Sequence, residues 1–130
     1  MRSVLNVLDS TVLIDYLRGR PAVERVTALR AAGDVPATTA VNVEEIVRGL
    51  RPSEHRAVDA LVAGLVVLPI DETTARAAGT WRREFAARGT ALWQADCLIA
   101  AATAQHGARL CTGNPKDFPM IDVDHWPVGA

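Results

Sequence analysis

The stretch NVLDSTVLIDYLRGR, residues 6–20, changes its hydrophobic pattern at Asp9. The residues just before Asp9 form a short apolar run of the kind that makes a buried strand. After Asp9, apolar residues recur at helical spacing until Gly19 ends the pattern. We therefore predict a strand over residues 4–8 and a helix over residues 10–17, with an acidic residue at their junction.

The same alternation of short apolar runs and longer alanine-rich helical patterns continues along the chain. It predicts an α/β fold around a central, mostly parallel sheet of four to five strands. Further strands are predicted over 65–68, 109–112 and 120–123, with a short extended piece near 33–36. Further helices are predicted over 22–31, 42–49, 52–63, 71–88 and 94–106, with caps at Asn42 and Asp71. The last of these helices is apolar nearly all round, so we expect it to be buried.

Length and composition predict one domain over residues 1–130, because 49% hydrophobic residues in 130 suffice for one core. The longest apolar stretch, residues 61–70, is too short to cross a membrane, and residues 1–8 lack the order of a signal peptide. We therefore expect a cytoplasmic protein with no membrane contact. The net charge of −1 argues against a broad basic face for duplex nucleic acid, but it leaves room for a local groove.

Four acids are candidates for one site. Asp9 follows the first strand, Asp117 follows the strand over 109–112, and Glu45 and Asp96 lie in the first turns of their helices. In an open α/β sheet, ligands bind outside the carboxyl ends of the strands, where helix N-termini also point. The pattern predicts that these acids converge there.

Each acid also has an ordinary structural explanation, because acids favour helix N-termini. Asp9 would then cap the first helix, Glu45 would reach back to the backbone of Asn42, and Asp96 would oppose its helix dipole. However, an acid at the start of a buried helix is costly unless it is paired or bound to a metal. No Lys or Arg lies beside Asp9 or Asp96 in sequence, and hard oxygen ligands favour Mg²⁺ or Mn²⁺.

The two cysteines, Cys97 and Cys111, each lie inside an apolar run and lack zinc-site spacing, so we expect buried free thiols. Asp15 is interpreted as a helix-face acid near the mouth of the site. Trp93, three residues before Asp96, and Trp81, on the helix before it, are candidates for stacking on RNA bases. Trp81 is also explained by packing in the core or in a dimer.

Three segments, VLDSTVLIDYLRG, VNVEEIVRGL and WQADCLIAAATAQHGARLCTGNPKDF, resemble the PIN-domain ribonucleases, specifically the VapC-type toxins of bacterial toxin–antitoxin pairs. The resemblance implies a three-layer α/β/α domain and a metal-dependent endoribonuclease. It places the catalytic acids at Asp9, Glu45 and Asp96, with Asn114 and Asp117 competing for the fourth position. Mg²⁺ or Mn²⁺ would be held chiefly by Asp9 and Asp96 and would activate a water for phosphodiester hydrolysis.

The resemblance also implies a substrate and partners. The substrate would be a structured RNA, such as tRNA or ribosomal RNA, and the protein partners would be a VapB-type antitoxin and a second copy of the chain. Alanine-rich helical faces over 22–32 and 58–63 offer apolar surface for a dimer, although a core explains them equally. Two other functions stay open: a catalytically inactive PIN-fold binding module, and a phosphoacceptor signalling domain with an acidic Mg²⁺ pocket.

Overall fold

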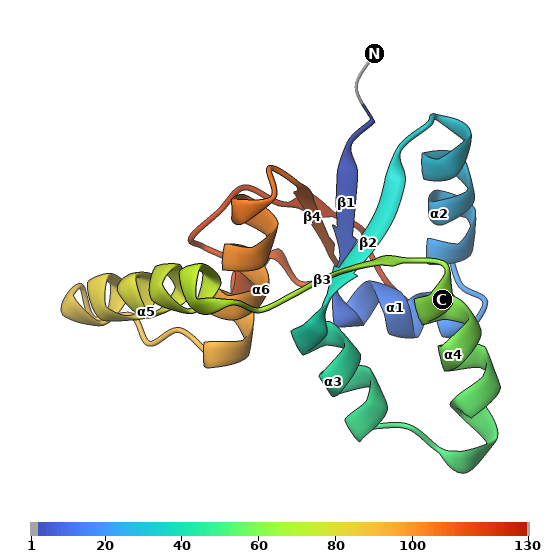
Figure 1. Cartoon of the computed structure of the whole chain (residues 1–130), viewed down its shortest axis with the longest axis horizontal. Helices are drawn as coiled ribbons and strands as arrows, with labels where there is room; N and C mark the ends of the chain where they lie inside the picture. Colours follow the sequence, from blue (N-terminus) through green and yellow to red (C-terminus); the bar gives the residue numbers. More distant parts are fainter. Residues whose placement is uncertain (1–2, 130) are drawn as a thin grey trace.

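The computed structural model describes residues 3–129, and a five-stranded parallel sheet in the order β3-β2-β1-β4-β5 lies at its centre (Figure 1). The strands are β1 (Leu5–Leu8), β2 (Val35–Thr39), β3 (Val66–Leu68), β4 (Arg109–Thr112) and β5 (Asp124–His125). The predicted α/β class and strand number are confirmed. The ends of the predicted domain, residues 1, 2 and 130, lie outside the described residues.

Helices connect the strands, as a parallel sheet requires. They are α1 (Ser10–Leu17), α2 (Ala22–Ala31), α3 (Ala40–Arg48), α4 (His55–Ala63), α5 (Glu72–Ala87) and α6 (Gln94–Gln105), with short 3₁₀ turns η1 (Pro52–Glu54) and η2 (Pro115–Asp117). The helix predicted from Pro52 thus begins as a 3₁₀ turn, which suits a proline at its first position. Over residues 3–129 we find no helix long and apolar enough to cross a membrane.

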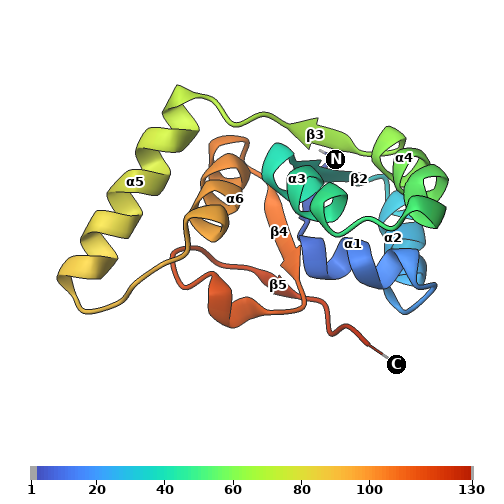
Figure 2. The ribbon, with the colours of Figure 1, turned by 90° about the horizontal axis from the view of Figure 1, so that it is seen from below.

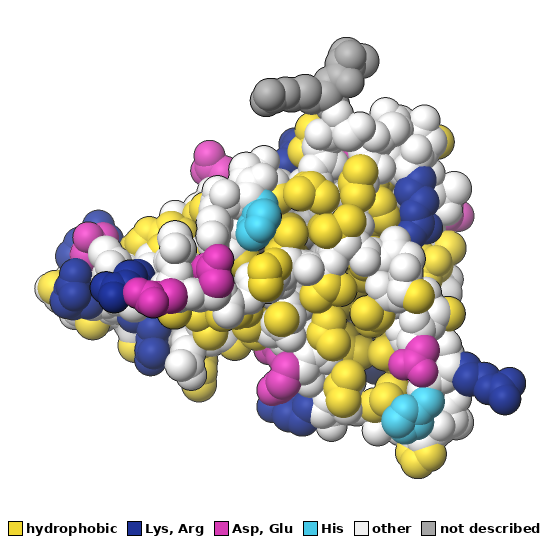
Figure 3. Space-filling model, in the orientation of Figure 1, with side chains coloured by type: hydrophobic (Ala, Val, Ile, Leu, Met, Phe, Trp, Pro, Cys, Tyr) yellow, Lys and Arg dark blue, Asp and Glu magenta, His cyan; other side chains and the backbone are white. Residues whose placement is uncertain are grey.

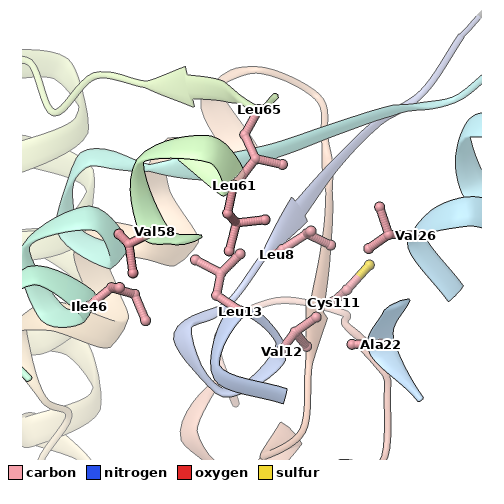
Figure 4. Close-up of a cluster of buried hydrophobic side chains, with 10 residues drawn as sticks. All are labelled: Leu8, Val12, Leu13, Ala22, Val26, Ile46, Val58, Leu61, Leu65 and Cys111. Atoms are coloured by element: carbon pink, nitrogen blue, oxygen red, sulfur yellow. The ribbon is translucent and has the colours of Figure 1, made fainter. Parts of the chain in front are cut away.

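The two faces of the sheet carry separate cores, because successive residues of a strand point to opposite faces. Leu8 of β1 and Cys111 of β4 face the helices α1, α2, α3 and α4 (Figure 4). The apolar faces of α2 and α4 are buried in this core, through Val26, Val58 and Leu61 among others. Packing within the chain therefore accounts for the alanine-rich helical faces that the sequence left open between core and dimer.

The opposite face is covered by α6, which packs on Val7 of β1 and Leu110 of β4. The middle of α6 is buried on all sides, because α5 covers its outer surface through Ala78 and Trp81 (Figure 2). The predictions of a buried helix here and of core packing for Trp81 are confirmed. The three-layer arrangement is thus formed by four helices on one face and the α6–α5 pair on the other.

The last strand was predicted in the wrong place. The apolar segment 120–123 does not pair with the sheet, and Met120, Ile121 and Val123 instead pack their side chains on the α6 core. β5 follows at Asp124–His125, where the backbone lies opposite Cys111 and Thr112 of β4. Hydrophobicity reports burial of a side chain, whereas strand pairing depends on where the backbone runs beside its neighbour.

Asp15 was also misinterpreted, since it does not stand at the mouth of the site. It is 2% exposed, and its carboxylate accepts hydrogen bonds from the backbone N–H groups of Ala22 at 3.0 Å and Gly129 at 2.9 Å. The Ala22 group is one of the unpaired donors at the start of α2. Asp15 therefore joins α1 to the start of α2 and to the C-terminal segment.

Candidate active site

The carboxyl ends of three neighbouring strands form the site. Asp9 directly follows the central strand β1, Thr39 ends β2 on one side of it, and Thr112 ends β4 on the other. The backbone N–H of Asp9 still pairs with the Cys111 carbonyl at 3.0 Å, so Asp9 is held in the register of the sheet. The chain reaches this edge in three separate segments, which only the parallel topology brings together.

Asp9 occupies the N-cap position of α1, but its carboxylate makes no capping hydrogen bond, so the simple capping explanation is wrong. The side chain is 6% exposed and accepts three hydrogen bonds from other side chains. Asn42 Nδ2 donates to Oδ1 at 3.2 Å, while Thr112 and Thr11 hydroxyls donate to Oδ2 at 2.8 and 3.2 Å. These donors hold the carboxylate in one orientation and offset the cost of burying its charge.

Asn42 is the functional residue that the sequence reasoning missed. The predicted cap of α3 is wrong: Thr39 caps the helix, and Asn42 is the third residue of a reciprocal capping box with it. The Asn42 side-chain oxygen accepts from the Thr39 hydroxyl at 2.8 Å, which leaves its NH₂ group free for Asp9 and for Ser10 Oγ at 3.0 Å. The Thr-x-x-Asn spacing, read as a capping box, was the available signal.

Glu45 does not reach back to Asn42, as its capping explanation required. Its Oε1 accepts a hydrogen bond from the Ser10 hydroxyl at 2.7 Å, across from α3 to α1. Ser10 in turn accepts from Asn42, so Asp9 and Glu45 are joined through two side chains. Glu45 therefore faces the same edge of the sheet as Asp9.

On the other side of Asp9, the loop after β4 continues the hydrogen-bond network. The Thr112 hydroxyl accepts from the Asn114 backbone N–H at 3.0 Å, and the Asn114 side chain donates to Asp117 Oδ2 at 2.8 Å. The two residues that competed for the fourth position in the sequence thus contact each other directly. Asn114 orients Asp117, which is exposed on η2.

Asp96 completes the set from the opposite layer of the fold. It is half-buried in the first turn of α6. Burial raises the pKa of its carboxyl to about 6, and the nearby charges of Asp117, Asp9 and Glu45 add to the increase. The structure therefore brings together all four predicted acids, with three carboxylates near enough to disfavour a charge on the fourth.

Within residues 3–129, these carboxylates form no ion pair with a basic side chain. The ion pairs found within residues 3–129 join Arg76 to Glu72 and Arg109 to Asp124, away from this site. In the same range, no group of three or more His, Cys, Asp or Glu side chains is placed to hold a metal ion together. Mg²⁺ is commonly bound through only one or two carboxylates with its other positions left to water and phosphate, so this donor set fits that ion.

A cleft of about 320 Å³ opens beside Glu45, between α1, α3 and the η1–α4 segment. Its apolar lining includes Ile14, Leu17, Ile46, Leu50 and Val58, and its charged lining includes Arg18, Arg51, Glu45 and Glu54. The cleft is thus continuous with the acidic site through Glu45, while two arginines lie along its wall.

The cysteines play no part in the site. Cys97 and Cys111 are buried free thiols, as predicted. Burial raises the pKa of Cys97 and raises that of Cys111 to about 12, so neither thiol is activated as a nucleophile.

Comparison with known proteins extends over nearly the whole chain. Residues 7–123 match the PIN domain family. Ribonuclease VapC10 of Mycobacterium tuberculosis is 36% identical over 117 residues, which cover 89% of this chain and 87% of that protein. Ribonuclease VapC19 of the same organism is 32% identical over 118 residues, covering 90% and 94% of the two chains.

A solved structure has the same architecture. A chain of a toxin–antitoxin complex from Klebsiella pneumoniae superposes with a TM-score of 0.75 at 25% identity, and the match covers 98% of this chain and 100% of that one. The order of elements around the acidic edge is therefore that of a known fold.

Proposed function

The chain belongs to the PIN domain family, and we propose that it is a metal-dependent endoribonuclease of the VapC type, the toxin of a toxin–antitoxin pair. The observation that carries this proposal is the convergence of Asp9, Glu45, Asp96 and Asp117 at one edge of the sheet, where none of them forms an ion pair with a basic side chain of the described residues. Such a set of carboxylates attracts a divalent cation together with a phosphate group.

Asp9 and Asp96 are the proposed ligands of Mg²⁺ or Mn²⁺, one from each layer of the fold. When bound, the ion would polarise the phosphodiester and lower the pKa of an attacking water. Asn42 and Thr112 hold Asp9 in a fixed orientation, and Ser10 and Asn114 do the same for Glu45 and Asp117. Mutation of such hydrogen-bond partners around a metal site commonly lowers metal affinity or activity 10- to 100-fold.

We propose a structured RNA such as tRNA or ribosomal RNA as the substrate, cut in an unpaired loop. The net charge of −1 supports a local site over an extended phosphate-binding face. The bases of an unpaired loop are unstacked, and its phosphates are not held in a duplex. A small acidic edge with a bound cation can therefore bind one phosphate of such a loop.

We propose a VapB-type antitoxin and a second copy of the chain as protein partners. The Klebsiella neighbour is itself part of a toxin–antitoxin complex, which supports the first. The cleft beside Glu45 offers an apolar floor for a partner segment and leads to the carboxylates. An arginine from such a segment would be attracted to these acids and would compete with the metal.

The test of the catalytic function uses purified chain, freed of antitoxin, and end-labelled total tRNA and ribosomal RNA. The RNA is incubated with Mg²⁺, Mn²⁺ or EDTA. Glu45→Gln and Asp96→Asn are compared with Glu44→Gln, which removes an exposed acid from the neighbouring position of the same helix. We expect discrete cuts with wild type and Glu44→Gln, and none with EDTA or either site variant.

Equal cutting by wild type and Asp96→Asn would overturn the catalytic proposal, since a contaminating nuclease would explain it. Absence of cutting under every metal would favour a PIN-fold binding module without activity. The phosphoacceptor alternative has no support from the family match over residues 7–123.

A further inference from the structure

Trp93 is unusually exposed for a tryptophan. Its side chain is 78% exposed, the largest value among the exposed large hydrophobic residues in the described part of the chain. The other two tryptophans, Trp81 and Trp126, pack against the cores, whereas Trp93 belongs to none of the three apolar clusters. A large aromatic ring left in water is a candidate for contact with a ligand or partner.

The position of Trp93 places this ring beside the candidate active site. Trp93 is the N-cap of α6, and Asp96 is the third residue of the same helix. The two residues are three positions apart, so they lie within one turn of each other at the helix start. The Trp93 carbonyl accepts the first helical hydrogen bond, from Cys97 N–H at 3.1 Å, so the backbone is fixed while the ring stays free.

We propose that Trp93 stacks on an unpaired nucleobase of the RNA strand that is cut. This inference rests on the proposed function, because it takes the phosphate to lie at Asp9 and Asp96. A nucleotide's base lies close enough to its phosphate to reach a ring one helical turn from Asp96. Bases in a duplex already stack on their neighbours, so the ring selects a single-stranded segment.

A stacked base explains the surroundings of Trp93 better than a protein contact does. The exposed apolar side chains of Val47, Val66 and Val67 lie instead on α3 and β3, where they are 54%, 43% and 39% exposed (Figure 3). The apolar residues of the hollow beside Trp93, Val41, Ile70 and Leu98, are partly buried. A protein interface needs a group of exposed apolar side chains, whereas one flat ring suffices for one base.

Stacking also supplies affinity that does not depend on basic residues. The chain as a whole has a net charge of −1, which gives it no general attraction for the RNA backbone. A ring that contacts a base face provides binding energy that salt does not screen.

The experiment measures binding in Mg²⁺ with proteins that all carry Glu45→Gln, so that the proposed metal ligands Asp9 and Asp96 remain and cutting does not interfere. Short oligoadenylate is titrated into this Glu45→Gln parent and into Trp93→Phe, Trp93→Ala and Trp126→Phe made in it, with an abasic ribose-phosphate oligomer of the same length as the control. We expect oligoadenylate to quench tryptophan fluorescence in the parent and Trp126→Phe but not in Trp93→Phe. Affinity should fall roughly five- to a hundred-fold in Trp93→Ala and remain near that of the parent in Trp93→Phe.

Several outcomes would overturn the inference. They are equal affinity of the parent and Trp93→Ala for oligoadenylate, equal binding of the abasic oligomer, and no quenching at the highest oligoadenylate concentration. If Trp93→Ala instead changes the molar mass measured by light scattering, the ring is a contact between two copies. Base-dependent quenching together with no RNA cutting by wild type in Mg²⁺ would refute the proposed function and retain the stacking site.

Discussion

Asp9, at the end of the central sheet, and Asp96, in the helix α6 on one face of that sheet, border the same site, yet their surroundings differ. Asp9 is nearly buried and accepts three side-chain hydrogen bonds. Asp96 is half-buried, and burial together with three neighbouring carboxylates raises the pKa of its carboxyl to about 6. The protein therefore fixes the orientation of one carboxylate, and it disfavours the charge of the other.

In the proposed metal site, this difference would give the two acids separate roles. The donors around Asp9 fix its orientation before any ion arrives, which lowers the cost of ordering a ligand on binding. The electrostatic cost at Asp96 is relieved when a cation enters the site or when the carboxylate is protonated. In the proposed site, Asp9 would thus supply a fixed ligand geometry, while Asp96 would supply attraction for the cation.

The largest expected effect is on RNA cleavage, and it should be the same for substitutions at Asp9 and at Asp96. Replacing either proposed ligand, in Asp9→Asn or Asp96→Asn, should reduce RNA cleavage by about 10³-fold or more, because each removes a charged ligand from the metal. Cleavage rates at saturating Mg²⁺ measure this, with Glu44→Gln as the control. Loss of activity in only one variant would show that the two acids do not hold the same ion.

The next largest effect concerns the hydrogen bonds around Asp9 and does not involve Asp96. Asn42→Ala leaves Asp9, Ser10 and Thr39 without their shared partner, and we expect it to lower the free energy of unfolding by about 2–3 kcal/mol. Urea denaturation in EDTA measures the change. Thr103→Val is the matched control, since its buried hydroxyl bonds only to the carbonyl of Ile99. A cost no greater than that of the control would mean that this network is not holding Asp9.

The smallest expected effect is on the free energy of unfolding, which should change in opposite directions in Asp96→Asn and Asp9→Asn. In the absence of metal, Asp96→Asn removes a charge that the folded state disfavours, so it should raise the free energy of unfolding at pH 7. After discounting for exposure to solvent, we expect a gain of about 1 kcal/mol. Asp9→Asn should instead lower the free energy of unfolding, because it loses hydrogen bonds to a charged acceptor.

The pH dependence follows from the same pKa increase. The Asp96 carboxyl titrates near its ordinary pKa of 3.8 in the unfolded chain and at about 6 in the folded chain. Between these values the folded state binds more protons, so the contribution of Asp96 to stability falls as pH rises from about 4 to about 6. Denaturation in EDTA across this range should show the decrease in wild type and not in Asp96→Asn. Parallel curves for the two proteins would contradict it.

Local sequence patterns predicted much of the fold correctly. The helices over 10–17 and 22–31 and the strand over 109–112 begin and end where predicted. Asp71 caps α5 as expected, because its carboxylate accepts from the Thr74 backbone N–H at 2.9 Å. In each case the signal lies within a few neighbouring residues, such as a cap, a glycine or an uninterrupted apolar run.

Two of the errors have a different cause, because the last strand and the position of Asp15 depend on contacts between residues far apart in sequence. The cap of α3 is instead a local contact between Thr39 and Asn42 that was assigned to the wrong residue. Asp15 holds Gly129, 114 positions away, and β5 is defined by its pairing with β4. No local pattern contains such a partner, because the spacing of apolar residues records burial and not the identity of the neighbour.

The amino-acid sequence by itself determined the alternation of strands and helices and the order of the acids along the chain, since both depend on local hydrophobic period and capping preference. Only the tertiary structure determined which hydrogen-bond donors and charges surround each acid. The parallel sheet brings Asn42 and Thr112 to Asp9 as hydrogen-bond donors, and it brings three carboxylates to Asp96. A carboxyl group's energy is set by burial and by the charges and donors around it, and these are arranged by packing in space.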